Sequence, residues 1–457
     1  MAGRLLGVFL EPLHAQSEGV EAMFDVLESI GTTAVVLTLI ASRPAPSGRG
    51  VRMPPLHVDG HRRVYARPVW GKDSVQVETF PAEDPDPSLF PAGGYSPRRV
   101  AVPADVDRSV PRRMIAEARR RGLAVYAQIK PLIPPGVRSE DQPVYPDGSV
   151  PTPPQVAMIG SPCSPAIREY GLAVVQDTVR AFPELDGLFL DWAEYGAYAF
   201  EDLFTCLGPH SAVLARAAGL DWDLLATQVR AVWDRLHRLS DADLRPAATA
   251  LSRLIDEAPG WAEFLRFKAE TVTTFYRAVR RTLDAAGRTD LRLMARGWPP
   301  PWNRWSGMDY GALAEVCTAA TPKLFAFDYC AVPRWYGEVL KRWNPALSEP
   351  AILDALTAWL DLPDNFPARR FDLYAIPAED EPHPVGVPAY RRRVEAVLGA
   401  VGGRCAVQPF AHCHMPEAMW HEQVRMLRDA AVDGIWIQMY GYLSESKLQT
   451  LRDEWHS

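Results

Sequence analysis

The sequence predicts one (β/α)8 TIM barrel spanning residues 1–457, with long insertions after its second and fourth strands. Short apolar runs alternate with helical patterns along the whole chain, which is typical of parallel βα units. Eight such runs occur, and they reach both ends of the chain, which favours a closed barrel over an open sheet. A chain of 457 residues with 47% hydrophobic residues can bury the large core that such a barrel needs.

The predicted strands are short and rich in leucine, β-branched and aromatic residues, as buried strands are. We expect them at residues 5–10, 34–40, 123–129, 188–190, 291–295, 324–327, 405–408 and 434–439. Apolar residues at helical spacing predict helices between them, at residues 20–30, 111–121, 166–181, 263–286, 310–320, 390–401 and 416–431. Pro111 and Pro416 suit the first turns of their helices, and Gly122 suits a helix end.

Two excursions interrupt this regularity. Residues 41–108 are rich in proline, glycine and polar groups, and residues 196–262 contain additional helical segments. Both follow strands, so we expect them to lie over the carboxyl end of the barrel, where loops shape substrate clefts. Neither is expected to form an independent domain.

Polar side chains stand at the carboxyl ends of nearly all predicted strands. Core packing would favour apolar strand ends, whereas active sites of parallel barrels are built at this end. The fourth strand is the clearest case, since Asp186-Gly-Leu-Phe-Leu-Asp-Trp-Ala-Glu-Tyr195 places two carboxylates after a buried run. The predicted site residues are Glu11, Lys130, Asp191, Trp192, Glu194, Arg296, Trp298, Trp302, Asp328, His412, His414, Gln438 and Tyr440.

Aromatic residues indicate the class of substrate. The chain has 14 tryptophans, and the loop Trp298-Pro-Pro-Pro-Trp-Asn-Arg-Trp305 contains three of them. Aromatic faces with polar edges suit sugar rings, which present apolar C–H faces and hydroxyl groups. We therefore interpret Trp298 and Trp302 as parts of a wall on which a sugar stacks.

One pattern resembles a known family. The stretch Cys163-Ser-Pro-Ala-Ile-Arg-Glu-Tyr170, followed by Asp186-Gly-Leu-Phe-Leu-Asp191, resembles glycoside-hydrolase-like TIM barrels of the family-10-like and amylase-like kinds. The segments from Phe264 to Lys268 and from Gly307 to Tyr329 look like the fifth and sixth strand regions of the same proteins. The resemblance covers residues 120–330 most clearly.

The resemblance implies roles for the carboxylates. Asp191 matches the nucleophile at strand four of several α-glycosidase barrels, and Asp328 is the nearest match to their acid/base. The Asn-Glu pair of β-glycosidase barrels is absent at strand four, and strand seven ends in Gln408, so an α-linked substrate is favoured. From the charges, we expect Lys130 and Arg296 to lower the pKa of Asp191, with Glu194 as an alternative acid.

Three other hypotheses remain. A metal-dependent sugar isomerase or lyase would use Glu11, Asp191, Asp328 and His414 as ligands of a divalent ion. A Schiff-base aldolase would use Lys130 as its nucleophile. The third hypothesis is a barrel that binds glycans without cleaving them, which would need neither a metal ion nor a nucleophile. The hydrolase hypothesis requires no metal and no cofactor.

Composition limits the partners. The net charge of -7 argues against a nucleic-acid partner, because binding to nucleic acid would require a basic face. Six scattered cysteines without a CxxC pair suit reduced thiols, and no apolar run is long enough to cross a bilayer. We expect a cytoplasmic protein with a carbohydrate substrate and no nucleic-acid or membrane partner. The sequence leaves the oligomeric state open.

Overall fold

The structure, a computed structural model, describes residues 4–56, 62–152, 159–362, 369–381 and 385–455, and of residues 326–328 the backbone alone. Within these residues, parallel strands close into a barrel with eight strand positions, in the order β1-β2-β6-β7-β8-β9-β11-β12 and back to β1. The prediction of a (β/α)8 barrel is confirmed. The barrel strands are β1 (Leu5–Leu10), β2 (Ala34–Leu37), β6 (Ala124–Ile129), β7 (Gly187–Leu190), β8 (Arg292–Gly297), β9 (Ala319–Leu324), β11 (Phe410–His412) and β12 (Gly434–Gln438).

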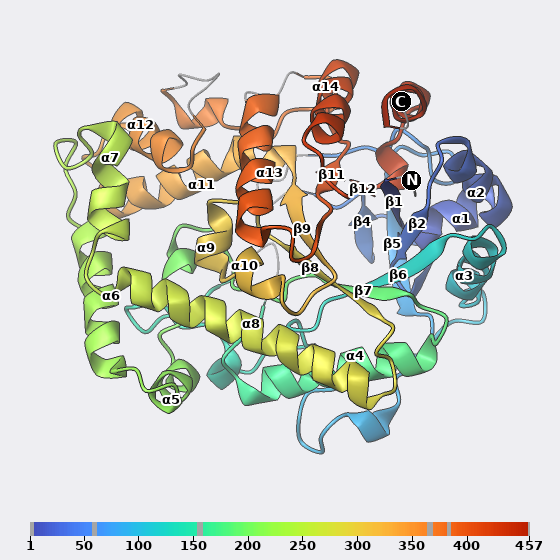
Figure 1. Cartoon of the computed structure of the whole chain (residues 1–457), viewed down its shortest axis with the longest axis horizontal. Helices are drawn as coiled ribbons and strands as arrows, with labels where there is room; N and C mark the ends of the chain where they lie inside the picture. Colours follow the sequence, from blue (N-terminus) through green and yellow to red (C-terminus); the bar gives the residue numbers. More distant parts are fainter. Residues whose placement is uncertain (1–3, 57–61, 153–158, 363–368, 382–384, 456–457) are drawn as a thin grey trace.

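Helices surround this barrel (Figure 1). Those between successive strands are α2 (Val20–Ser29), α3 (Val110–Arg120), α4 (Pro165–Ala181), α8 (Trp261–Ala285), α10 (Tyr310–Leu313), α13 (Val387–Val401) and α14 (Glu417–Asp429). Two more, α1 (Pro12–Glu18) and α15 (Glu445–Thr450), follow β1 and β12. Within the described residues, no helix is both long enough and apolar enough to span a membrane.

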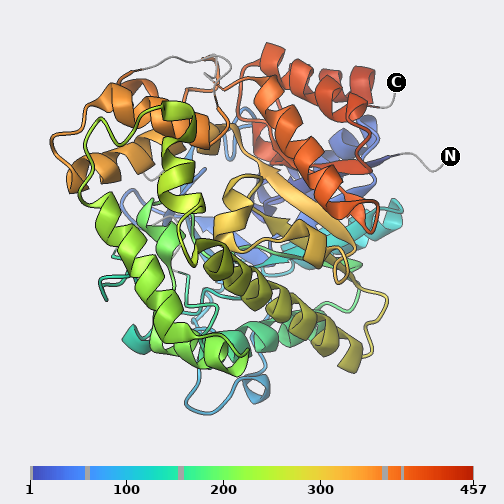
Figure 2. The same ribbon diagram turned by 60° about the vertical axis from the view of Figure 1, so that its left-hand side comes forward.

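Additional elements follow β2, β7, β8 and β9. A three-stranded antiparallel sheet is formed by β3 (Ile40–Pro44), β5 (Val75–Pro81) and β4 (Val51–Met53). Further helices are α5 (Pro209–Ala217), α6 (Trp222–Leu236), α7 (Ala247–Leu251), α9 (Trp302–Ser306), α11 (Ala326–Trp343) and α12 (Glu349–Trp359). Figure 2 shows α6 and α7 on the same side of the molecule as α11 and α12, and α7 packs against α12.

The sixth strand differs from the prediction. Residues 310–320 were expected to be helical and residues 324–327 to be the strand, but the helix ends at Leu313 and β9 runs from Ala319 to Leu324. The segment Ala319-Ala-Thr-Pro-Lys323 lacks β-branched character apart from Thr321, so its propensity hides the strand. Pairing with β8 and β11 buries every residue of β9, and this tertiary context overrides propensity.

The seventh strand is also divided. A short β10 (Ala406–Val407) pairs with β9, and β11 then pairs with both β9 and β12. Pro409 lies between them, and a proline has no N–H to donate to a strand neighbour. The predicted strand at residues 405–408 therefore covers β10 only.

Aromatic rings fill the inside of the barrel. The Trp436 ring lies 4.9 Å from the rings of both Tyr126 and Phe189, and Phe189 lies 5.6 Å from Phe410. Glycines on neighbouring strands make room for these rings. A Cβ on Gly7, which is paired with Trp436, would lie 2.0 Å from that indole.

This packing leads to a stability prediction. We expect Gly7→Ala to destabilise the fold by at least the upper end of the ~1–3 kcal/mol typical of overpacking, because the new methyl group would overlap a fully buried indole. Gly399→Ala in α13 is the control, since a Cβ there meets nothing within 4 Å and alanine favours a helix by about 1 kcal/mol. Urea unfolding of both variants measures the difference. Equal stabilities would show that the barrel interior is not tightly packed.

Candidate active site

Side-chain alternation along the barrel strands determines which polar groups face inward. In β7, Phe189 contacts interior rings, so Asp191, two residues further, points to the same side. The guanidinium of Arg296 lies 4.3 Å from the ring centre of Phe410, which also faces the interior. The inward-facing positions at the carboxyl end of the barrel thus carry charged and polar side chains above a layer of aromatic rings.

Asp191 is the centre of this group. Its side chain is buried, with 5% of the residue exposed. One carboxylate oxygen lies 3.2 Å from the Lys323 ammonium and 3.7 Å from Nε of Arg296, and the other accepts a 3.2 Å hydrogen bond from Gln128. Burial alone would raise the pKa of Asp191, but the charges of Arg296, Lys323 and Lys130 lower it to about 2. Asp191 is therefore ionised at neutral pH.

The chain turns sharply after this aspartate. Trp192 has φ of +59°, in the left-handed region that a bulky residue rarely adopts. Its ring lies 4.8 Å from the Lys323 ammonium and 5.5 Å from the Tyr198 ring. Strained backbone of this kind concentrates at functional sites, and here it places an aromatic face beside the Asp191–Lys323 ion pair.

Glu194 lies deeper than Asp191 and is fully buried. Its carboxylate accepts hydrogen bonds from the backbone N–H of Trp298 at 3.2 Å and from the Ser306 hydroxyl at 2.8 Å, and it pairs with Lys323 at 3.3 Å. Burial raises the pKa of Glu194, although Lys323 and these two donors act to lower it. Because three protein donors already occupy this carboxylate, its evident role is to hold Lys323 beside Asp191.

Lys323 therefore joins two buried carboxylates, and its removal should be costly. We expect Lys323→Met to lower the free energy of unfolding by about 3–5 kcal/mol at pH 7.5, because Glu194 would lose the ammonium that it contacts and Asp191 would keep only the more distant Arg296. Lys323 lowers both carboxylate pKa values, so without it both carboxylates bind protons more readily. The deficit should then shrink as the pH falls toward 4.5.

Urea unfolding at the two pH values measures this effect. Lys72→Met serves as the control, because Lys72 is exposed and a surface substitution changes stability by about 0.5 kcal/mol at most. A deficit that is the same at both pH values would contradict the assigned ion pairs.

Glu11 stands at the end of β1 and differs in its environment. Its carboxylate accepts a hydrogen bond from the Tyr65 hydroxyl, and only 7% of the residue is exposed. Burial raises the pKa of Glu11 to about 7, against the lowering effects of Tyr65, Arg63 and Lys130. Lys130 thus acts on both Glu11 and Asp191, and at neutral pH Glu11 is partly protonated while Asp191 is ionised.

The remaining predicted residues differ in their exposure and in their contacts. Lys130 is exposed, and Gln438 is partly exposed and accepts a 3.3 Å hydrogen bond from Arg296. His412 and His414 are buried, and the backbone N–H of His414 donates to the ring Nδ1 of His412 at 3.0 Å. Tyr440 is buried too, with the Arg67 guanidinium 4.7 Å from its ring centre.

The tryptophan loop packs into the protein. Trp298, Trp302 and Trp305 are each at most 1% exposed. The Trp302 ring stacks on Tyr329 at 5.2 Å with an interplanar angle of 1°, and the Arg393 guanidinium lies 5.3 Å from its centre. These rings support the loop after β8 in the structure, and direct substrate contact by Trp298 and Trp302 stays a prediction.

Asp328 lies in a helix and not at the end of a strand. It was expected to end the sixth strand, but that strand ends at Leu324 and Asp328 belongs to the first turn of α11. Its side chain lies outside the described residues, so its role as the acid stays a prediction. The inward-facing charged residue of β9 is Lys323 instead.

Three site residues were missed in the sequence. Lys323 was missed because the sixth strand was predicted at residues 324–327, whereas β9 runs from Ala319 to Leu324. Gln128 could have been found, since it precedes Lys130 by two residues and alternation puts both on one side of β6. Tyr65 lies far from any strand end, and no pattern in its surroundings indicates that it reaches Glu11.

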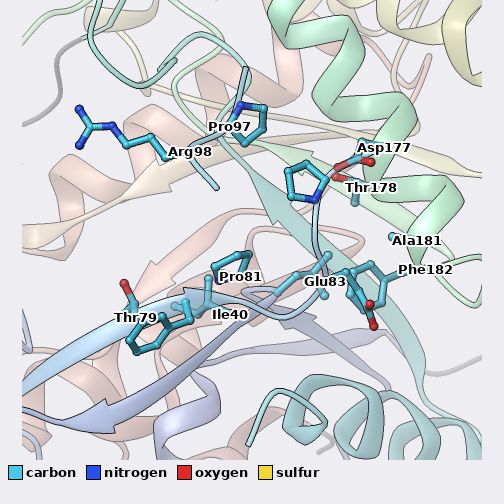
Figure 3. Close-up of a pocket in the computed structure, with 13 residues that line it drawn as sticks. Ile40, Thr79, Pro81, Glu83, Pro97, Arg98, Asp177, Thr178, Ala181 and Phe182 are labelled. Carbon is cyan, nitrogen blue, oxygen red and sulfur yellow. The ribbon is translucent and has the colours of Figure 1, made fainter. Parts of the chain in front are cut away.

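A cavity of about 370 Å³ lies elsewhere, between the β3–β5 sheet and α4 (Figure 3). Its wall includes Ile40, Phe80, Asp177 and Phe182, and no predicted site residue lines it. The candidate site is therefore defined by the strand ends and not by this cavity. In the described part of the chain, no three His, Cys, Asp or Glu side chains form a group that could hold a metal ion.

Comparisons with known proteins complete the description. No protein-family model matches the chain, and no curated protein sequence matches it. Among solved structures, the catalytic domain of β-amylase from Paenibacillus polymyxa is similar, with 10% identity over 98% of this chain and 97% of that one, and a TM-score of 0.48. A β-galactosidase from Bacillus circulans sp. alkalophilus has 10% identity over 99% of this chain and 55% of its own, with a TM-score of 0.49.

An endo-β-1,4-mannanase from Thermotoga petrophila has 9% identity over 99% of this chain and 76% of its own, with a TM-score of 0.37. Similarity at this level does not determine the reaction of this chain, and the resemblance to family-10-like and amylase-like hydrolases stays a resemblance.

Proposed function

We propose that this chain is a glycoside hydrolase whose site lies at the carboxyl end of the barrel. One observation carries the proposal: the surroundings of two inward-facing carboxylates move their pKa values in opposite directions, up to about 7 for Glu11 and down to about 2 for Asp191. Glycosidases need one ionised and one protonated carboxyl group beside the scissile bond. Environments that separate two pKa values in this way indicate which group is the acid.

In this mechanism Asp191 attacks the anomeric carbon while Glu11 gives its proton to the departing glycosidic oxygen. A water molecule then adds to the anomeric carbon, its proton passes to Glu11, and Asp191 leaves as a carboxylate. Lys323 and Arg296 keep Asp191 ionised, and Lys130 stands near both carboxyl groups. Asp328 and Glu194 are the acids that the sequence suggested, and the resemblance favours an α-linked substrate.

A panel of aryl glycosides tests the proposal. It should pair the α- and β-anomers of common neutral and acidic sugars and compare wild type with Asp191→Asn, Glu11→Gln, Asp328→Asn and Glu194→Gln. We expect one anomeric class to be cleaved by wild type and lost in Asp191→Asn and Glu11→Gln. Loss in Asp328→Asn with full activity in Glu11→Gln would assign the acid role to Asp328 instead.

A further inference from the structure

Cationic side chains outnumber carboxylates around Asp191. Arg296, Lys323 and Lys130 all act on the Asp191 carboxylate, and the second carboxylate in contact with this group is Glu194. Three positive charges therefore face two negative ones. The buried charges balance, because Arg296 and Lys323 face Asp191 and Glu194, so the surplus charge is that of the exposed Lys130 ammonium. A neutral sugar does not require this extra cation beside the site, whereas an anionic ligand would pair with it.

The neighbouring Glu11 does not supply that counter-charge. Arg63 and Lys130 both lower its pKa, Arg63 with the larger effect, but burial outweighs them. Glu11 adds a third carboxylate, but burial raises its pKa to about 7, so Arg296, Lys323 and Lys130 still exceed the ionised carboxylates at neutral pH. The site is thus positively charged at neutral pH in a protein whose net charge is -7.

Two buried donors of Arg296 have no hydrogen-bond partner among the residues that the structure describes. Arg296 is 3% exposed, and its Nη2 donates to the Gln438 side chain at 3.3 Å. Its Nε and Nη1 are buried and have no hydrogen-bond partner, although Nε lies 3.7 Å from Asp191. Buried donors in native proteins are almost always satisfied, and a guanidinium matches the two oxygens of a carboxylate.

The same group is reachable from solvent. Lys130 is exposed and, among the described residues, forms no ion pair. Gln128 and Gln438 are partly exposed, and they hydrogen-bond to Asp191 and Arg296 respectively. A ligand that displaced these glutamine contacts would meet the Arg296 guanidinium inside and the Lys130 ammonium outside.

We propose that the substrate carries a carboxylate, as the glycoside of a uronic acid does, and that Arg296 and Lys130 bind this carboxylate. This inference rests on the proposed function, because it names the substrate of the same site. Binding of the carboxylate can nevertheless be measured without turnover. A substrate of this class neutralises the surplus charge and supplies an acceptor to an Arg296 donor.

A binding experiment tests the proposal. The affinities of D-glucuronate and D-galacturonate are each compared with that of the corresponding neutral sugar. Titration calorimetry or saturation-transfer NMR measures them on wild type and on Asp191→Asn. We expect the uronates to bind about tenfold more tightly or better, as a charge-assisted hydrogen bond allows. Lys130→Gln should reduce uronate binding several-fold and leave the neutral sugars unchanged, whereas Lys130→Arg should retain the preference. Because Lys130 is exposed, these variants leave the fold intact.

The outcomes distinguish a failure of the acidic-substrate proposal from a failure of the proposed hydrolase function. Neutral sugars that bind as well as uronates, or no detectable binding of either uronate, would overturn the acidic-substrate proposal. Hydrolysis of neutral glycosides alone would also overturn it while supporting the hydrolase. Uronate binding that depends on Lys130, together with no hydrolysis of any glycoside in the panel, would support the acidic ligand and contradict the proposed reaction.

Discussion

Replacing Asp191 by asparagine is expected to lower kcat for the best glycoside of the panel by about 10⁴-fold or more, a size usual for the loss of a catalytic nucleophile. Asparagine keeps the shape of the side chain but cannot attack the anomeric carbon. The control is Asp186→Asn at the other end of the same strand, where the carboxylate accepts from the Val125 N–H at 2.7 Å. That variant should keep kcat within about twofold, because it lies far from the proposed chemistry.

Stability must be followed in the same experiment. Asp191→Asn removes one of the two carboxylates that pair with Lys323 and the one that pairs with Arg296, so its free energy of unfolding should also fall. Activity is therefore compared at a temperature where circular dichroism shows both variants folded. A folded Asp191→Asn protein with wild-type kcat would show that this carboxylate has no part in the chemistry.

The second large effect concerns Glu11. We expect Glu11→Gln to lower kcat by about 10²–10⁴-fold, the usual contribution of a general acid. In wild type, kcat/KM should fall as the pH rises through about 7, because Glu11, with its pKa raised by burial, must be protonated to act. The Tyr65 hydrogen bond lowers the Glu11 pKa, so Tyr65→Phe should move this limb of the profile to higher pH.

The pH profile separates this role from a structural one. Glu11→Gln should lose the limb near pH 7 altogether, whereas Glu21→Gln on α2 should keep both the limb and the rate. A limb that stays near pH 7 in Glu11→Gln would assign the titration to another group. Asp328→Asn, measured alongside, shows whether that group is the acid suggested by the sequence.

Much of this fold can be read from the sequence because periodicity and composition agree. Residues 5–10 and 188–190 are continuous apolar runs, and the observed strands match them closely, since buried parallel strands need apolar residues on both faces. The prediction failed at β9, where Ala319, Ala320 and Pro322 give no strand signal and pairing with neighbours determines the structure. Phe325 and Phe327, next in the chain, looked more like a strand than the strand itself.

The site was predictable only in part, for the same reason. Asp191, Arg296 and Gln438 follow from strand ends and alternation, because the barrel brings all strand ends together. Lys323 depends on the register of β9, and the Tyr65–Glu11 contact joins residues 54 positions apart in the chain, which no local pattern predicts. Tryptophan content indicated an open sugar-binding wall, but large aromatic side chains also fill junctions between loops and barrel, as Trp302 does.

Hydrolysis in ¹⁸O-labelled water tests the proposed reaction most directly. The glycoside that wild type converts should be digested in this water and the products analysed by mass spectrometry, with Asp191→Asn as the comparison. We expect one labelled oxygen in the released sugar, none in the released aryl alcohol, and no conversion by Asp191→Asn. Conversion without label in the sugar would indicate an isomerase or lyase, and no conversion of any glycoside by folded wild type would contradict the proposal that the barrel is a glycoside hydrolase.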